Sequence, residues 1–398
     1  MIERSYYISL LEKWRNRPVI KVITGVRRCG KSTLMKMFRD KLLSEGVDEA
    51  QITSLNLEDI DNEQYLDYKT LYTYIKGRLQ KDRMNYIFLD EIQMVTSFQK
   101  TIDSLQLIEN VDIYVTGSNA YLLSGEIATL LSGRYVEIRM YPLSFKEYMS
   151  VQPKDISEES AYRKYIEFGA FPYVTQLEAD RILVQDYLSG LYSTIVLKDV
   201  VARRKISDVM MLESVVNFLT DNIGNISVTK RISDTMTSAG RKISAHTVEN
   251  YISALLASYI FYSVSRYDVK GKQYLKNGQK LYLCDMGLRN IIIGTKTGDL
   301  GHILENVIFM ELLRRGNEVY VGKAGDAEID FITLNGNEKT YYQVSLSVRD
   351  ERTLNRELAP LLGVADSYPK YLLTLDNDPV VMHNGIKQMY ALDWLLDQ

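Results

Sequence analysis

The sequence has few cysteines and no long hydrophobic run. Only Cys29 and Cys284 occur in 398 residues, which is too few for a disulfide framework or a cysteine-ligated zinc site. No run of about 18 apolar residues is present, so we expect no membrane-spanning helix. The first segment is charged and amphipathic, without an apolar stretch of the signal-peptide type. We therefore expect a reduced, cytoplasmic protein that does not enter a membrane.

The chain also lacks an excess of positive charge. Its formal net charge is −3 and its pI is about 5.8, so any contact with nucleic acid must come from a local basic patch. The hydrophobic fraction of 46% and the charged fraction of 25% are ordinary for globular proteins. At about 100–200 residues per domain, the length allows two or three domains, each with its own core.

A glycine-rich loop lies between a predicted strand and a predicted helix. Residues 19–23 are β-branched and apolar, as in a buried strand, and residues 34–43 have apolar side chains at helical spacing. Between them, residues 25–33 match G-x-x-x-x-G-K-[ST] at every fixed position. The main-chain N–H groups of such a loop converge on phosphate oxygens at a helix N-terminus. We assign nucleotide binding to Gly25, Val26, Arg27, Arg28, Cys29, Gly30, Lys31, Ser32 and Thr33.

Two acidic residues complete the predicted nucleotide site. The apolar run 86–89 ends in Asp90 and Glu91, at the carboxyl end of a strand, where parallel sheets bind ligands. Asp90 and the Ser32 hydroxyl would hold Mg²⁺, and Lys31 would reach the β- and γ-phosphates. Glu91 would act as the general base that orients and polarises the attacking water. These residues predict a magnesium-dependent nucleoside triphosphatase.

Further strand-like segments define the expected fold class. Residues 52–57, 111–115 and 135–139 read as strands and residues 65–79 as a helix, giving an α/β P-loop domain with a five-stranded parallel sheet. The extra strand and the glutamate beside the metal aspartate resemble AAA-like ATPases, in which a strand separates the two phosphate-site strands. No guanine-specific N-K-x-D element is present, which favours ATP. Ser118 and Asn119, after the strand at 111–115, are candidate sensors of the γ-phosphate.

Three arginines have open roles. Arg27 and Arg28 lie inside the loop and could contact phosphate or a neighbouring subunit, or be solvated. Arg134 opens the strand at 135–139 and could neutralise transition-state charge in cis, or in trans across an oligomer. A structural ion pair is the alternative for Arg134.

Ordered motifs along the chain resemble a known family. GVRRCGKST, LDEIQ, VTGSNA, LSGRYVEI, YPLSFKEY, FGAFP (168–172) and EIDF (328–331) occur in this order. Together they resemble the bacterial and archaeal AAA-type ATPases joined to a C-terminal domain of unknown function. The resemblance implies an ATPase core (1–145), a helical lid (146–205), a winged-helix-like domain (206–290) and a C-terminal α/β domain (291–398) similar to the PD-(D/E)XK nucleases.

The predicted winged-helix region is locally basic. Residues 201–290 contain 13 Lys and Arg against 7 Asp and Glu, a local charge of +6 of the kind that nucleic-acid binding requires. Three helices (208–222, 228–238 and 244–259) precede two strands (261–267 and 280–284), as in a winged helix-turn-helix. The candidate DNA contacts are His246, Asn250 and Tyr251 on the third helix and Lys270, Lys272 and Lys276 on the wing. A protein-binding winged helix is the alternative.

The C-terminal region has a degenerate nuclease pattern. The nuclease-like fold implied by the resemblance would gather Glu305, Asp330 and the strand at 341–345 around one metal. Such a site needs two or three carboxylates and a lysine, but Gln343 and Ser345 occupy the second acid and the lysine positions. We therefore expect a binding platform that does not cleave DNA.

Three hypotheses follow for the whole chain. The first is an ATP-driven conformational switch that acts on DNA or a protein partner. The second is an ATP-gated nuclease, which the serine at 345 disfavours. The third is an ATP-binding scaffold that hardly hydrolyses, which Glu91 disfavours.

Overall fold

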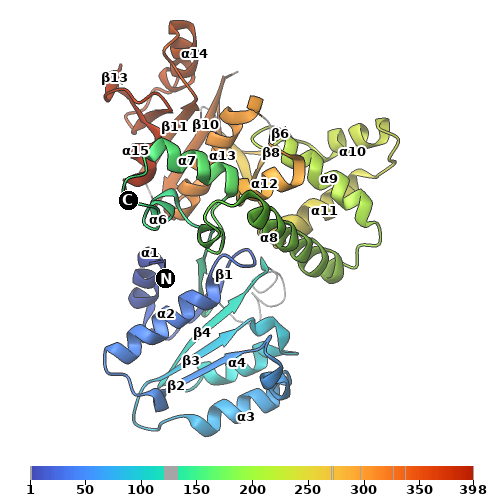
Figure 1. Cartoon of the computed structure of the whole chain (residues 1–398), viewed down its shortest axis with the longest axis vertical. Coiled ribbons are helices and arrows are strands. Elements are labelled where there is room, and N and C mark those ends of the chain that lie inside the picture. The colour runs from blue at the N-terminus through green and yellow to red at the C-terminus, as the bar shows by residue number, and fades with distance from the viewer. Residues whose placement is uncertain are drawn as a thin grey trace. The chain divides into compact units, whose positions relative to one another are not determined.

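A computed structural model of the chain describes residues 2–120, 133–269, 271, 273–295, 297–325, 327–336 and 338–397. The chain forms two compact units (Figure 1). The first contains Met1–Pro142 and Ala257–Tyr259, and the second contains Leu143–Leu256 and Ile260–Gln398.

The first unit is built on a five-stranded sheet in which every strand pair is parallel. The strand order is β2-β3-β4-β1-β5. The strands are β1 (Ile20–Thr24), β2 (Ile52–Asn56), β3 (Asn85–Asp90), β4 (Val111–Gly117) and β5 (Tyr135–Arg139). The helices are α1 (Ser5–Trp14), α2 (Lys31–Ser44), α3 (Tyr68–Arg78) and α4 (Phe98–Gln106), with short 3-10 turns at Glu49–Gln51, Ile60–Tyr65 and Ile92–Met94.

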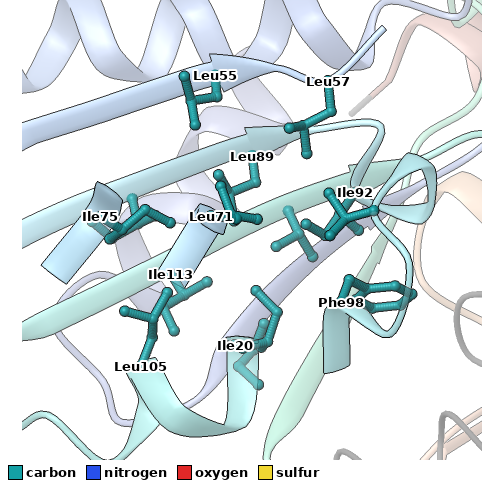
Figure 2. Close-up of a cluster of buried hydrophobic side chains, with 14 of the residues drawn as sticks. Ile20, Leu55, Leu57, Leu71, Ile75, Leu89, Ile92, Phe98, Leu105 and Ile113 are labelled. Atoms are coloured by element: carbon teal, nitrogen blue, oxygen red, sulfur yellow. The ribbon is translucent and has the colours of Figure 1, made fainter. Parts of the chain in front are cut away.

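Apolar side chains alternate between the two faces of this sheet. One face packs under α3 and α4, where Leu71, Leu89 and Ile113 belong to one buried cluster (Figure 2). On the other face, Phe38 of α2 lies against Phe88 and Tyr114, with ring centroids 6.4 and 5.3 Å apart. Because both faces of the sheet are covered, successive residues of a strand are mostly apolar, and its sequence is a nearly continuous apolar run. Helices on both faces leave the carboxyl edge of the sheet open for the site.

The second unit contains a nine-stranded mixed sheet of order β13-β14-β12-β11-β10-β9-β7-β8-β6. Its strands are β6 (Ile226–Ser227), β7 (Phe261–Asp268), β8 (Gln273–Leu283), β9 (Glu318–Ala324), β10 (Ala327–Asn335), β11 (Glu338–Ser345), β12 (Lys370–Thr374), β13 (Val381–His383) and β14 (Ile386–Tyr390). The predicted domain boundaries at 205 and 290 fall inside this unit, and the sheet takes strands from both sides of residue 290.

Helices make up the rest of the second unit. They are α6 (Phe145–Met149), α7 (Glu158–Phe168), α8 (Arg181–Thr194), a π-helix (Ile195–Ala202), α9 (Val209–Asp221), α10 (Thr229–Ser238), α11 (Ala245–Ala257), α12 (Met286–Ile293), α13 (Leu300–Arg314), α14 (Glu351–Leu362) and α15 (Ala391–Leu396). Short 3-10 turns lie at Val174–Gln176 and Thr297–Asp299. In the described part of the chain, no helix has the length and apolar character needed to cross a membrane.

The FGAFP motif forms a turn that is hydrogen-bonded to Asp285, the residue that precedes α12. The Asp285 carboxylate accepts hydrogen bonds from the backbone N–H of Ala170 at 2.6 Å and of Leu288 at 3.0 Å. Gly169 has φ +88°, and a Cβ there would lie 2.4 Å from an Asp285 oxygen. Only glycine fits this contact, which explains the motif in terms of packing.

The five predicted strands of the first unit are confirmed, but the expectation that the extra strand at 52–57 separates the two phosphate-site strands was wrong. The extra strand at 52–57 is β2, which lies at the edge of the sheet. The strand that separates β1 from β3 is β4, which follows Asp90 in the sequence.

Candidate nucleotide site

The glycine-rich loop links β1 to α2 at the carboxyl edge of the sheet. Gly25 has φ +146°, and a Cβ at this position would lie 2.1 Å from the carbonyl oxygen of Met140. Gly30 has φ +109° and directly precedes α2. Both positions require glycine because of their backbone angles. Val26 and Cys29 are fully buried and anchor the loop against the core, and Cys29 lies 3.6 Å from the Met140 oxygen.

Lys31 and the residues after it begin the helix. The Lys31 ammonium is 4% exposed and donates to the carbonyl oxygens of Gly25 at 2.9 Å and Val26 at 3.2 Å. The Lys31 ammonium therefore lies against the first residues of the glycine-rich loop. Ser32 and Thr33 lie exposed in the first turn of α2, where main-chain N–H groups have no helical acceptor. A helix N-terminus of this kind favours anions.

Asp90 lies beside Ser32 although 58 positions separate them in sequence. Asp90 is the last residue of β3 and is 9% exposed. Burial raises the pKa of its carboxyl, and hydrogen bonds from Thr116 and Ser32 oppose that rise. Hydroxyl and carboxylate oxygens are the ligands that Mg²⁺ uses in such sites. Among the described residues, no group of three or more Asp, Glu, His or Cys side chains could hold a metal, so phosphate and water oxygens would have to supply the remaining ligands.

Glu91 is held in an unusual backbone conformation. Its φ is +53°, a left-handed value that is uncommon and costly for a non-glycine residue. The Glu91 carboxylate accepts a hydrogen bond from the Ser118 hydroxyl at 3.2 Å and one from the Gln93 side-chain amide. The hydroxyl of Thr116 bonds both the Glu91 backbone N–H and the Asp90 carboxylate.

Sequence reasoning missed two of these contacts. Thr116 and Gln93 both touch Glu91. The contact of Thr116 depends on β4 lying beside β3 in the sheet, and no local sequence pattern gives that order. Ser118 and Asn119, predicted as γ-phosphate sensors, are both buried at the end of β4. The structure thus brings Ser118 to Glu91, and the sensor role of both residues stays a prediction.

The three candidate arginines have different surroundings. Arg27 pairs with Glu58 at 3.2 Å. Arg28 is exposed and has φ +66°, a position in which a side chain is strained. Arg134 lies away from the loop, because its carbonyl accepts the N–H of Ile20 at the amino end of β1.

The position of Arg134 corrects its proposed role within the chain. Strands β1 and β5 run parallel, with Ile20 beside Tyr135 and Thr24 beside Arg139. Five strand residues span about 16 Å, so Arg134 and Gly25 lie at opposite edges of the sheet. Burial raises the pKa of Asp103 in α4, and the nearby Arg134 charge opposes this. Arg134 therefore does not reach the phosphate site of its own chain, and a role in trans stays a prediction.

The second unit brings together the acidic residues expected of a degenerate nuclease site. The Asp330 carboxylate accepts the Val344 N–H at 2.8 Å, and Gln343 donates to Glu357 at 2.9 Å. Burial and the charge of Glu305 raise the pKa of Asp330 well above its ordinary value. Within the described residues, the Ser345 hydroxyl donates its hydrogen bond to the carbonyl oxygen of Ser347.

A lysine occupies the middle of this cluster. The Lys280 ammonium of β8 lies 2.9 Å from Glu305 and 2.8 Å from Glu328 and is 3% exposed. Sequence reasoning missed this role, since it counted Lys280 in the basic patch. The cluster therefore contains a lysine beside its carboxylates although serine occupies position 345, and the expectation of a site that does not cleave DNA stays a prediction.

The proposed DNA-binding residues are only partly exposed. His246 and Asn250 lie on the exposed face of α11. Tyr251 is 6% exposed, and its hydroxyl donates to the Asp208 carbonyl at 3.4 Å, so its placement on a recognition surface was wrong. Lys270 and Lys272 fall outside the described residues, and the side chain of Lys276 is not described.

Two family models match separate parts of the chain. Residues 17–149 match the model of an AAA domain, and residues 159–299 match a domain of unknown function (DUF8612). The Walker-type ATPase PABY2304 of Pyrococcus abyssi superposes with a TM-score of 0.51 and 14% identity, covering 73% of this chain and 96% of that chain. This likeness supports a P-loop ATPase fold.

Two relatives match along most of the sequence. An "Uncharacterized protein" of Methanocaldococcus jannaschii is 29% identical over 85% of this chain and 77% of its own length. An "Uncharacterized protein" of Haemophilus influenzae is 40% identical over 100% of this chain and 99% of its own length. The chain therefore belongs to the family of the Haemophilus influenzae protein, and it carries an AAA domain of the P-loop ATPase type followed by a domain of unknown function (DUF8612).

Proposed function

We propose that this protein is a magnesium-dependent ATPase whose hydrolysis cycle changes how its second unit engages a partner. The observation that carries the proposal is the convergence of Lys31, Asp90 and Glu91 at one edge of the five-stranded sheet. Lys31 begins α2, Asp90 ends β3 and Glu91 follows it directly, and each has the chemistry that triphosphate hydrolysis requires.

The loop and the first turn of α2 bind the triphosphate. Main-chain N–H groups of residues 25–33 cradle the β-phosphate, and Lys31 turns from the loop carbonyls to the β- and γ-phosphate oxygens. Ser32 and Asp90 would hold Mg²⁺, since their side chains already lie together. When bound, the ion would neutralise phosphate charge.

Glu91 directs the attacking water. Its carboxylate accepts a proton from the water as the water oxygen bonds to the γ-phosphorus. The bond from the γ-phosphorus to the bridging oxygen then breaks, leaving ADP and inorganic phosphate, and the proton passes on to phosphate or solvent. Ser118, which hydrogen-bonds Glu91, would respond to the γ-phosphate through that contact. Such positioning and charge stabilisation account for most of phosphoryl-transfer catalysis.

The hydrolysis assignment is tested by one variant and a matched control. We expect Glu91→Gln to retain ATP binding while phosphate release falls sharply, because the amide cannot accept the proton. Glu63→Gln changes an exposed carboxylate in the 3-10 turn Ile60–Tyr65 and should hydrolyse like the wild type. Wild-type hydrolysis by Glu91→Gln would show that Glu91 is not the base. Wild-type protein that binds ATP without turnover would favour the scaffold hypothesis.

A second candidate function, DNA binding by the second unit, has its own support. The order α9-β6-α10-α11-β7-β8, with β6 pairing β8, fits a winged helix. Exposed cations occur on α10 and in the turn to α11, namely Lys230, Arg231, Arg241 and Lys242. Lys280 and Arg289 do not add to this surface, because both are buried and paired with carboxylates.

DNA binding is tested by titrating labelled duplex DNA at increasing salt. We expect affinity to fall steeply with salt, since phosphate contacts release counterions. Replacing Lys230 and Arg231 together by glutamate should abolish the complex. Replacing Lys36 and Arg39 on α2 of the first unit by glutamate provides the charge-matched control and should not. Absence of salt-dependent binding would favour a protein partner.

A further inference from the structure

A single buried hydroxyl joins the two acids of the nucleotide site. Thr116 lies in β4, between β1 and β3, and is fully buried. Its Oγ1 atom accepts the backbone N–H of Glu91 at 2.9 Å and donates to the Oδ1 atom of Asp90. A threonine hydroxyl carries one hydrogen and can also accept, so both contacts are satisfied together.

The sheet explains why a hydroxyl at this position can reach both residues. Thr116 pairs with Ile23 of β1 on one side. On the other side, Val115 pairs with Leu89 of β3, which places Thr116 level with Asp90. The polar end of Thr116 thus faces the site from the strand between the loop strand and the acidic strand.

The accepting half of this arrangement concerns the general base. Glu91 has φ +53°, a conformation that costs about 1–3 kcal/mol for such a residue and persists only when its surroundings enforce it. Thr116 binds the N–H of that same residue. Loss of the hydroxyl would leave a buried N–H without its acceptor and would release the backbone that aims the Glu91 carboxylate.

The donating half concerns the metal ligand. Asp90 is the last residue of β3 and is buried. A ligating carboxylate must be correctly oriented, and hydrogen-bond partners behind a ligand supply that orientation. Thr116 contacts Oδ1 of Asp90, which fixes the orientation of the carboxyl plane toward Ser32.

We propose that Thr116 is a positioning residue that prepares Asp90 for the metal and Glu91 for the water at the same time. This inference rests on the proposed ATPase function. Thr116 does not touch the substrate and acts through the two acids. Valine would have the same shape and the same preference for a strand, so the hydroxyl is the only property that the proposal requires.

The test compares Thr116→Val, which removes the hydroxyl, with Thr116→Ser, which keeps it. We expect Thr116→Val to hydrolyse ATP on the order of 10–100-fold more slowly and to need more Mg²⁺ for half-maximal rate, as when partners behind metal ligands are lost. Its affinity for ATP in EDTA should match that of the wild type. Thr116→Ser should restore both the rate and the Mg²⁺ dependence toward wild type.

Three results would overturn the proposal. The first is a general packing defect, in which Thr116→Val lowers ATP affinity in EDTA and with Mg²⁺ alike. The second is a Thr116→Val variant with the wild-type rate and Mg²⁺ dependence, and the third is a Thr116→Ser variant as impaired as Thr116→Val. If the wild type binds but does not hydrolyse ATP, the ATPase proposal fails. Thr116 is then judged by whether Thr116→Val loses the Mg²⁺-dependent part of ATP affinity.

Discussion

The hydroxyl of Ser118 donates a hydrogen bond to the Oε2 atom of Glu91 at 3.2 Å. The end of β4 is thereby linked to the acid that follows β3. The same carboxylate accepts a second bond from the Gln93 side chain. Both donors therefore hold the carboxylate of the proposed base in one orientation.

The first prediction concerns Gln93. We expect Gln93→Ala to lower the ATPase rate, because one of the two side-chain donors that orient the Glu91 carboxylate is lost. A hydrogen bond to a charged group contributes about 1.5–3 kcal/mol, so the decrease should be at most about 100-fold. Gln99→Ala, on α4 of the same unit, should leave the rate unchanged. A Gln93→Ala enzyme that hydrolyses ATP as fast as the wild type would mean that Gln93 does not align Glu91.

The second prediction concerns the strained arginine of the loop. Arg28 and Ser97 both have left-handed backbone angles, with φ +66° and +57°. Glycine relieves such strain but costs unfolded-state entropy, so both Arg28→Gly and Ser97→Gly should change the unfolding free energy by less than about 1 kcal/mol. Only Arg28→Gly should weaken ATP binding, because it removes a charge from the phosphate loop. If calorimetry gives Arg28→Gly and the wild type the same affinity for ATP, Arg28 does not contact the phosphates.

The third prediction concerns how the stability of the folded protein depends on pH through Asp285, which binds the FGAFP turn. Burial raises the pKa of Asp285 from 3.8 to about 6, although three backbone N–H groups oppose the shift. The folded protein thus holds this proton more tightly than the unfolded chain. The stabilisation from Asp285 is complete below about pH 4 and is lost as pH rises through about 6.

The measurement compares the wild type with Asp285→Asn by denaturant unfolding between pH 4 and pH 7. Over this range the wild type should lose about 2 kcal/mol relative to the variant, since each pKa unit corresponds to about 1.4 kcal/mol and part of the shift takes effect below pH 4. Other carboxylates titrate in both proteins and cancel in the difference. A difference in unfolding free energy that is independent of pH would contradict the assignment.

The fourth prediction concerns the buried lysine of the second unit. Lys280→Met leaves Glu305 and Glu328 without their cation. Breaking a buried pair in this way costs about 3–5 kcal/mol. Adding Glu305→Gln should recover part of this loss, because it removes the uncompensated buried charge. A double-mutant cycle in urea checks this coupling, and strictly additive effects would show that the two residues do not interact.

Local sequence patterns were sufficient for the strands, the glycine-rich loop and the two acids of the first unit. The loop residues follow from glycines that no other residue could replace, and Asp90 follows from an apolar run that ends in an acid. Contacts between strands that are distant in sequence were not predictable, because strand order is set by the packing of whole helices. Thr116 and Lys280 reached their partners through such order. The placement of Arg134 failed for the same reason, since a residue that begins a parallel strand lies at the edge opposite the loop.

Triphosphate binding at Lys31 is the property on which the proposed ATPase activity depends most directly. Isothermal titration of the purified chain with ATP and Mg²⁺ should give saturable binding with one site per chain, and Lys31→Ala should abolish it while the protein stays folded by circular dichroism. Wild-type protein that releases no heat and retains no labelled ATP, or a Lys31→Ala variant that binds as tightly as the wild type, would contradict it.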